Sequence, residues 1–154
     1  MYQRILVPVD GSPTSNAGLA EAMKLAKLTG AQLRLLRVVD DMPFLMSPEG
    51  YGAMAADVLA LLREAGEGML QRARTLASDS GIAVDTVLFD GLGGRLCDRV
   101  AEQAKDWHAD LIVLGTHGRR GVSRVLLGSD AEQVLRTAPV PVLLVRAGEA
   151  APLG

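Results

Sequence analysis

A glycine pattern between positions 115 and 129 is the part of the sequence that most directly indicates chemistry. The spacing is glycine, two residues, glycine, nine residues, then glycine and serine, formed by Gly115, Gly118, Gly128 and Ser129. Glycine lets a backbone approach a ligand and adopt positive φ without steric cost. A helix that begins at Ser129 would direct unpaired N–H groups and the positive end of its dipole toward that ligand. The pattern predicts a phosphate-binding site, because three arginines also lie between the second and third glycines: Arg119, Arg120 and Arg124.

The same segment also allows an interpretation without a ligand. Ser129 and Glu132, three residues apart, form the sequence pattern of a capping box, in which side chains satisfy the first helix N–H groups. The arginines could belong to a solvated loop, although a loop that is merely exposed has no need of three placed glycines. Asp130 lies in the first turn, where a carboxylate favours the helix dipole but repels phosphate. We therefore expect Asp130 to point away from a phosphate or to lower its affinity.

Asp10 is a second candidate, because it follows the first apolar run of the chain. Before Gly11 it can form a turn without any ligand. At the end of a strand it could instead accept a hydrogen bond from a nucleobase or a ribose, or help to hold Mg²⁺ bound to phosphates. His117 is interpreted as a polar loop residue or a ligand contact. Cys97 is interpreted as a buried residue rather than a reactive one.

Motifs of several enzyme classes are missing from the sequence. It contains no Gly-x-x-x-x-Gly-Lys-Ser/Thr loop, no Gly-x-Ser-x-Gly elbow and no Cys/His cluster with metal-ligand spacing. The run from Gly91 to Gly94 lacks the dinucleotide-binding fingerprint. Only two histidines and one cysteine are available for nucleophilic or metal chemistry. We therefore expect ligand binding without efficient turnover, with no catalytic residue assigned.

The elements that must position these residues alternate between strands and helices. Short apolar runs predict strands at residues 5–9, 32–39, 82–89, 110–114 and 140–145. Helices are predicted between them, at residues 13–29, about 57–80, about 93–107 and 129–137. Ser12 is the predicted N-cap of the first helix, with Pro13 at its first position and Gly30 at its end. Apolar residues at steps of three and four predict the buried face of the long second helix: Val58, Leu62, Ala65, Met69, Ala73 and Leu76.

This alternation predicts an α/β fold with a parallel sheet and right-handed crossovers. Open parallel sheets bind ligands outside the carboxyl ends of their strands, at the point where the strand order reverses. If the first and fourth strands are neighbours there, Asp10 and the glycine pattern face one crevice. A loop at residues 38–41 could close it. Residues 40–52, which are unusually apolar for a loop, are interpreted as a flap on the core or as a lid or partner-binding segment.

Length and composition exclude some classes of function. The 154 residues carry a net charge of −2 and only 3% aromatic residues, which argues against nucleic-acid binding. No apolar run is long enough for a membrane span, and no secretory signal is apparent. One cysteine excludes an intrachain disulfide and suits a reducing compartment, so a cytoplasmic location is expected. We expect one domain over residues 1–147 and a flexible C-terminal tail over residues 148–154.

The sequence resembles the universal stress protein (UspA-like) family, in its ATP-binding branch. The resemblance extends from the stretch between Arg4 and Ser12 to the stretch between Pro139 and Val145, and it includes the glycine pattern described above. It implies a single Rossmann-like domain of the adenine nucleotide alpha hydrolase-like type, with a five-stranded parallel sheet in the order 3-2-1-4-5 and helices on both faces. The nucleotide-binding residues that it implies are Pro8, Val9, Asp10, Val38, Gly115, His117, Gly118, Arg119, Gly128, Ser129, Asp130 and Ala131.

The resemblance also implies a function, namely ATP binding with Mg²⁺ by a regulatory or sensing module in a stress response. Family members commonly form homodimers through the last strand, here from Pro141 to Val145; other protein partners are unknown. Two alternatives remain: a slow ATPase or adenylate-transfer enzyme on the same fold, or an interaction module without nucleotide. The sequence departs from the family at Asp130 and Ala131, where an apolar residue and a hydroxyl residue are common. It also departs at Gly93, which replaces a proline.

Overall fold

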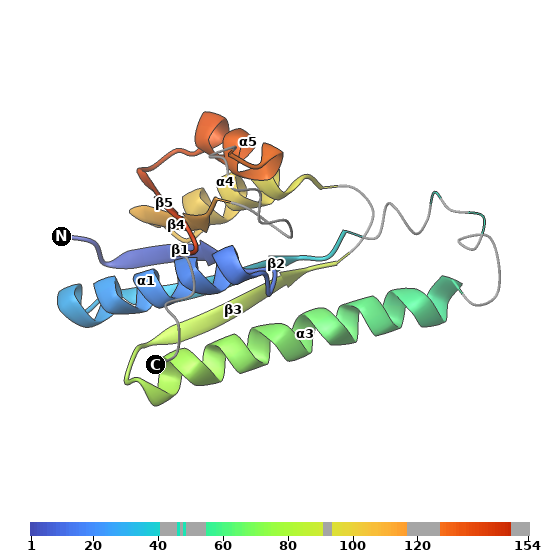
Figure 1. Ribbon diagram of the computed structural model, residues 1–154, viewed down its shortest axis with the longest axis horizontal. Coiled ribbons are helices and arrows are strands. Elements are labelled where there is room, and N and C mark those ends of the chain that lie inside the picture. Colours follow the sequence, from blue (N-terminus) through green and yellow to red (C-terminus); the bar gives the residue numbers. More distant parts are fainter. Residues whose placement is uncertain (41–45, 47, 49–54, 91–93, 117–126, 149–154) are drawn as a thin grey trace.

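The fold is an α/β sandwich around a five-stranded parallel sheet, seen in a computed structural model that describes residues 1–40, 46, 48, 55–90, 94–116 and 127–148. The strands are β1 (Arg4–Pro8), β2 (Gln32–Val38), β3 (Val84–Phe89), β4 (Leu111–Gly115) and β5 (Val142–Val145). The helices are α1 (Pro13–Thr29), α3 (Ala55–Asp79), α4 (Leu96–Asp106) and α5 (Ser129–Thr137). The strand order is β3-β2-β1-β4-β5, so the predicted fold class and order are confirmed (Figure 1).

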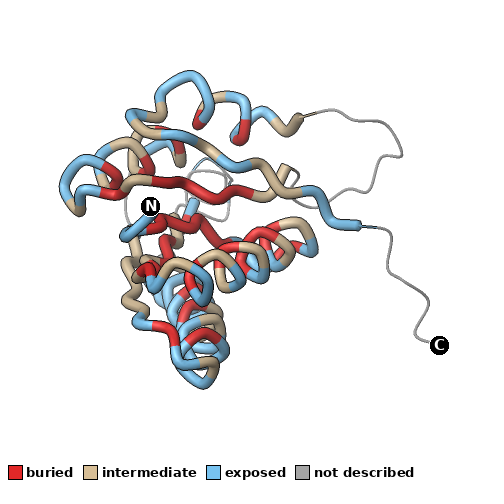
Figure 2. Tube along the Cα trace, turned by 90° about the vertical axis from the view of Figure 1, so that its left-hand side faces the viewer, coloured by how far each residue is buried: buried red, intermediate tan, exposed pale blue. Residues whose placement is uncertain are grey.

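Alternating side chains divide the core between the two faces of the sheet. In β1, Ile5 and Val7 pack with α1 and α3, whereas Leu6 packs with α4 and α5. Because both faces are covered, the strands are continuous apolar runs, as is typical of parallel sheets. Figure 2 shows the buried residues gathered in the strands and in the helix stripes that face them. Cys97 is buried in the layer of α4 and α5, as predicted.

The register of the strands determines where a ligand can bind. β1 pairs with β2 on one side, with Pro8 opposite Leu36, and with β4 on the other, with Ile5 opposite Leu111. The chain moves outward to β2 and β3 in one direction and to β4 and β5 in the other, so the strand order reverses between β1 and β4. The carboxyl ends of these two strands are therefore the expected ligand-binding edge.

The buried face of α3 differs from the predicted stripe. Residues that face the sheet are Gly66, Leu70, Ala73 and Ala77, whereas Leu62 and Leu76 are 37% and 57% exposed. A Cβ at Gly66 would lie 3.1 Å from Val39 Cγ2 and 3.2 Å from Leu88 Cδ1, so the helix approaches the sheet at this glycine. The face of α3 that contacts the sheet is therefore shifted by about one residue from the predicted stripe. The prediction of Leu62 and Leu76 as core residues is wrong. The N-terminal half of α3 extends beyond the sheet (Figure 1).

Both ends of α1 are formed as the sequence predicts. The Ser12 hydroxyl accepts a hydrogen bond from Ser15 N at 3.2 Å, and Pro13 is the first helical residue. Gly30 ends the helix with φ of 73°, a conformation that costs glycine little. In the described part of the chain no helix has the length and hydropathy of a membrane span. Gly93, most of segment 40–52 and the predicted tail, except residue 148, lie outside the described residues.

Candidate functional site

A cavity of about 640 Å³ opens at the carboxyl ends of β1 and β4, within the usual size of small-molecule sites. Nine of the predicted site residues line it: Pro8, Val9, Asp10, Val38, Gly115, Gly128, Ser129, Asp130 and Ala131. The structure therefore brings together residues from the ends of three strands and the start of α5. His117, Gly118 and Arg119, as well as Arg120 and Arg124, lie outside the described residues. That any of the predicted site residues contacts a nucleotide, whether or not it lines the cavity, stays a prediction.

The loop between β1 and α1 forms a wall of the cavity that is fixed by its own hydrogen bonds. Asp10 N donates to Ser15 Oγ at 3.0 Å, and Asp10 Oδ1 accepts from Ser12 N at 2.8 Å. Ser12 and Ser15 are each only 6% exposed. Among the described residues no donor reaches Asp10 Oδ2, so this oxygen is left to accept from a ligand hydroxyl.

Gly115, at the end of β4, packs directly against the backbone at the start of α1. A Cβ at Gly115 would lie 2.5 Å from both Thr14 C and Thr14 O and 2.8 Å from Ser15 N. No side chain fits between these backbones, so only glycine allows β4 and α1 to pack at this distance. Gly18, one turn further along α1, also faces Gly115, with 3.3 Å from its hypothetical Cβ to Gly115 N. The first glycine of the pattern is therefore explained by packing as well as by any ligand.

Backbone hydrogen bonds at Thr116 and Gly128 hold the rest of the described glycine pattern together beside the cavity. Thr116 N donates to Val145 O at 3.0 Å, and Gly128 N donates to Thr116 O at 3.0 Å. The two ends of the intervening segment are therefore held together at the cavity edge. Gly128 is the N-cap of α5 and offers no side chain to the first N–H groups of the helix.

The alternative interpretation of Ser129 as part of a capping box is wrong. Ser129 is the first residue inside α5 rather than its cap, so its side chain is not placed to receive the N–H group three residues later. Glu132 instead accepts a hydrogen bond from Arg136 Nη2 at 2.8 Å. Within the described residues, the first N–H groups of α5 thus have no side-chain acceptor. A helix start of this kind is suited to an anion.

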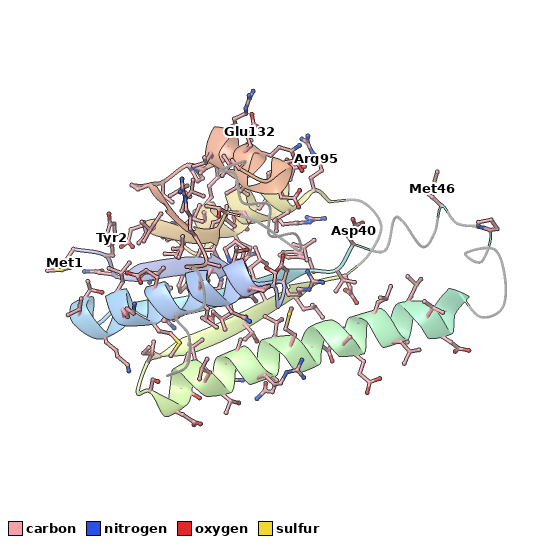
Figure 3. The ribbon with its side chains drawn as sticks, in the orientation of Figure 1. Met1, Tyr2, Asp40, Met46, Arg95 and Glu132 are labelled. Atoms are coloured by element: carbon pink, nitrogen blue, oxygen red, sulfur yellow. The ribbon has the colours of Figure 1, made fainter. Side chains whose placement is uncertain are left out.

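The start of α4 forms a further wall of the cavity, which the sequence interpretation missed. Gly94, Arg95 and Leu96 line it, and Arg95 is the N-cap of α4 without a side-chain hydrogen bond to the helix backbone. The Arg95 guanidinium instead donates to Asp98 at 3.2 and 3.5 Å. This hydrogen bond and the charge of Asp98 raise the pKa of Arg95. Arg95 and Asp40 both line the cavity, and both lie at the end of the sheet where the strands finish (Figure 3).

The cavity combines an apolar end with charged groups of both signs. Pro8, Val9, Val38 and Leu114 supply apolar surface for a flat ligand group. Among the described lining residues, the carboxylates are Asp10, Asp40 and Asp130, and the guanidinium groups are Arg37 and Arg95. Lining residues that the sequence interpretation did not name as ligand contacts include Ser12, Thr14, Ser15, Arg37, Gly94, Arg95, Leu96, Leu114, Thr116 and Gln133. The start of the third predicted helix could have been identified, because it lies at the same carboxyl edge of the sheet.

Comparisons with known proteins agree with this architecture. The model of the universal stress protein family matches residues 1–146. A universal stress protein of Methanocaldococcus jannaschii is 36% identical over 147 residues, covering 95% of this chain and 83% of the relative. The structure of the universal stress protein UspA of Lactobacillus plantarum aligns with a TM-score of 0.73 and 33% identity, covering 94% of this chain and 98% of that chain. A crystal structure of a universal stress protein in complex with cAMP aligns with a TM-score of 0.59 and 25% identity, covering 96% and 98%.

Proposed function

The chain belongs to the universal stress protein family, and on that basis we propose that it binds an adenine nucleotide, ATP with Mg²⁺, as a regulatory or sensing module in a stress response. The observation that carries this proposal is the cavity at the carboxyl ends of β1 and β4, where apolar surface, a carboxylate and two uncapped helix starts meet. The relative crystallised with cAMP supports a nucleotide as the class of ligand.

The apolar end of the cavity suits an adenine ring and the neighbouring carboxylate suits its ribose. Pro8, Val9 and Val38 offer surface without competing hydrogen-bond groups. Asp10 Oδ2 is available to accept from a ribose hydroxyl, because the other oxygen, Oδ1, already accepts from Ser12 N. The rigid loop fixes the position of this acceptor, which lowers the entropic cost of binding.

The start of α5 suits the phosphate groups. Gly128 leaves the first N–H groups of this helix without a side-chain cap, and the helix dipole adds positive potential at the same point. The described residues contain no group of three acidic, histidine or cysteine side chains that could hold a metal by themselves. Mg²⁺ would therefore enter with the phosphates, whose charge it offsets, and Asp10 is the carboxylate predicted to help hold it.

Isothermal titration calorimetry tests the proposal directly. We expect heat of binding with ATP and MgCl₂, and a rise in Tm with nucleotide concentration, because a ligand that binds only the folded state stabilises it. ADP, AMP and cAMP, titrated in parallel, identify the preferred nucleotide. Absence of both heat and a Tm shift at millimolar concentrations of all four nucleotides would contradict the proposal.

A matched pair of variants tests the position of the site. Asp10→Asn keeps an oxygen for Ser12 N but removes the charge, and we expect nucleotide affinity to fall about tenfold, the loss of one charge-assisted hydrogen bond. Asp110→Asn is the control, because Asp110 also accepts from backbone N–H groups, those of Gln3 and Arg4, at the opposite end of β4. Equal affinities for the two variants would exclude Asp10 from the site.

A sensing role requires that the nucleotide changes the protein without being consumed rapidly. Thr116 and Gly128 border the cavity and bracket the glycine-rich segment, so we expect nucleotide to slow amide hydrogen exchange at these two positions. We also expect ATP to be recovered intact after incubation with the protein for many binding lifetimes. Release of phosphate or pyrophosphate well above the background rate would favour an enzyme instead.

We further propose that two copies associate through β5. This strand pairs only with β4 among the described residues, and Leu143 on it is 36% exposed. An apolar edge strand invites pairing with a second strand. We expect light scattering to give the mass of a dimer for the wild type and of a monomer for Leu143→Glu. Leu76→Glu, on the exposed face of α3, is the control and should remain a dimer. A monomeric wild type at tens of micromolar would refute this assembly.

A further inference from the structure

We propose that Arg95 and Asp130 set the number of phosphate groups that the cavity prefers. Arg95 attracts the terminal phosphates of a nucleoside polyphosphate, and Asp130 opposes them. This inference rests on the nucleotide binding proposed above and concerns the choice among nucleotides, which that proposal leaves open. Both residues line the cavity, one at the start of α4 and one in the first turn of α5.

The starts of α4 and α5 are close enough for one ligand to contact both. The two helices pack against each other on the same face of the sheet. Cys97 in the first turn of α4 donates from Sγ to Gln133 Oε1 of α5 at 3.6 Å. Arg95 precedes Cys97 by two residues and Asp130 precedes Gln133 by three, so the two charged side chains originate on either side of this contact. A phosphate at the N–H groups of α5 would therefore lie within the reach of the Arg95 side chain.

Arg95 can exchange its present partner for a phosphate at little cost. Its side chain is 69% exposed, and the ion pair that it forms is with Asp98, in the first turn of the same helix. Pairs of this kind between exposed side chains hold weakly, because water competes for both groups. A guanidinium group matches phosphate oxygens with two parallel hydrogen bonds, which makes phosphate the stronger partner.

Asp130 acts in the opposite direction. It is exposed, and within the described residues no hydrogen bond or ion pair holds its carboxylate. The first phosphate of a nucleotide at the α5 start would be attracted by the helix N–H groups. Each further phosphate adds negative charge within a Debye length of this carboxylate, so repulsion grows with phosphate number.

The overall charge of the cavity makes this balance sensitive to a single residue. Three carboxylates and two guanidinium groups line the described part of the cavity. A triphosphate enters such a site only if its charge is offset locally. Arg95 supplies part of that offset and Mg²⁺ can supply the rest. Loss of Arg95 should therefore discriminate against ATP while sparing AMP, and neutralisation of Asp130 should do the reverse.

The test compares ATP with AMP in two variants, each with a matched control. Arg95→Gln and Asp130→Asn change the charges that line the cavity. Arg136→Gln and Glu132→Gln remove one positive and one negative charge of α5 from side chains that do not line the cavity and that form an ion pair at 2.8 Å. Affinities are measured by calorimetry without Mg²⁺ and with excess Mg²⁺, and Tm is measured for every variant.

We expect Arg95→Gln to weaken ATP about tenfold and AMP by less than about threefold, the difference corresponding to lost charge-assisted hydrogen bonds to the outer phosphates. Asp130→Asn should strengthen ATP several-fold without Mg²⁺, and less with it. Neither control should change the ratio of ATP to AMP affinity.

A wild type that binds both nucleotides, with a ratio that neither variant changes, would overturn this inference and leave the proposed function intact. An effect of Arg136→Gln as large as that of Arg95→Gln would also overturn it, because net charge alone would then explain the result. A wild type that binds no nucleotide would overturn the proposed function and this inference with it.

Discussion

Replacement of Gly115 by alanine tests whether the first glycine of the pattern is required by packing. The added Cβ would lie 2.5 Å from the backbone of Thr14, and ordinary contact begins at 3.4 Å. The end of β4 and the start of α1 must therefore separate by about 0.9 Å. The atoms on the far side are backbone and cannot turn away as a side chain could. We expect a loss at the upper end of the usual range for overpacking, about 3 kcal/mol.

This loss is measurable by urea and thermal unfolding. For a chain of this size it corresponds to a decrease in Tm of roughly 6–12 °C. Nucleotide affinity should fall as well, because the displaced backbone carries two walls of the cavity, at Thr14 and at Gly115.

Two other glycines provide the controls. Gly148→Ala meets no atom within 4 Å and should leave stability within about 0.5 kcal/mol of the wild type. Gly30→Ala also meets no atom, but its φ of +73° is strained for alanine, so it should lose roughly 1–2 kcal/mol without affecting the cavity. A Gly115→Ala protein as stable as Gly148→Ala would refute the packing argument. A Gly115→Ala protein that loses stability but keeps full nucleotide affinity would show that Gly115 is required for packing and not for binding.

Three further substitutions test the fold by urea denaturation. Ser12→Ala should cost about 1 kcal/mol, because it removes the cap of α1; an unchanged midpoint would contradict that role. Leu70→Ala should cost roughly 2–5 kcal/mol since Leu70 is 4% exposed, whereas Leu76→Ala, at 57% exposed, should cost less than about 0.5 kcal/mol. A larger loss for Leu76→Ala than for Leu70→Ala would instead support the buried face predicted from sequence. Arg34→Lys should cost about 1 kcal/mol, because lysine cannot reproduce the paired hydrogen bonds to Asp85 at 2.7 and 2.8 Å or the stacking on Trp107. Equal stability of the variant and the wild type would mean that the contacts of Arg34 with Asp85 and Trp107 make no net contribution to stability.

The sheet and the position of the cavity were predictable because they depend on features with a strong sequence signal. Continuous apolar runs indicate strands buried on both faces, and their alternation with helices leaves few possible topologies. The strand order came from the family resemblance rather than from the pattern. Once β1 and β4 are neighbours, Asp10 and Gly115 must lie at the same edge.

The face that α3 turns toward the sheet could not be predicted in this way. A period of three and four fits the stripe through Met69 and Leu76 as well as the stripe through Leu70 and Ala77. The choice depends on Gly66, which allows the helix to approach Val39 and Leu88 more closely than most side chains would. That contact joins residues that are far apart in the sequence, and a local pattern does not contain it.

The error at Ser129 has a different origin, and it bears on the function. A serine followed by a glutamate fits a capping box as well as it fits the first turn of a helix, and only the structure shows that Gly128 occupies the cap. Of the helices in the described part of the chain, three begin at the cavity. α1 is capped by Ser12, whereas α4 and α5 begin at Arg95 and Gly128 without a side-chain cap. A capped start is satisfied within the protein and can serve as a fixed wall. The two uncapped starts lie side by side and would gain an acceptor from an anion bound between them, so we expect the phosphate groups of the proposed nucleotide at α4 and α5 rather than at α1.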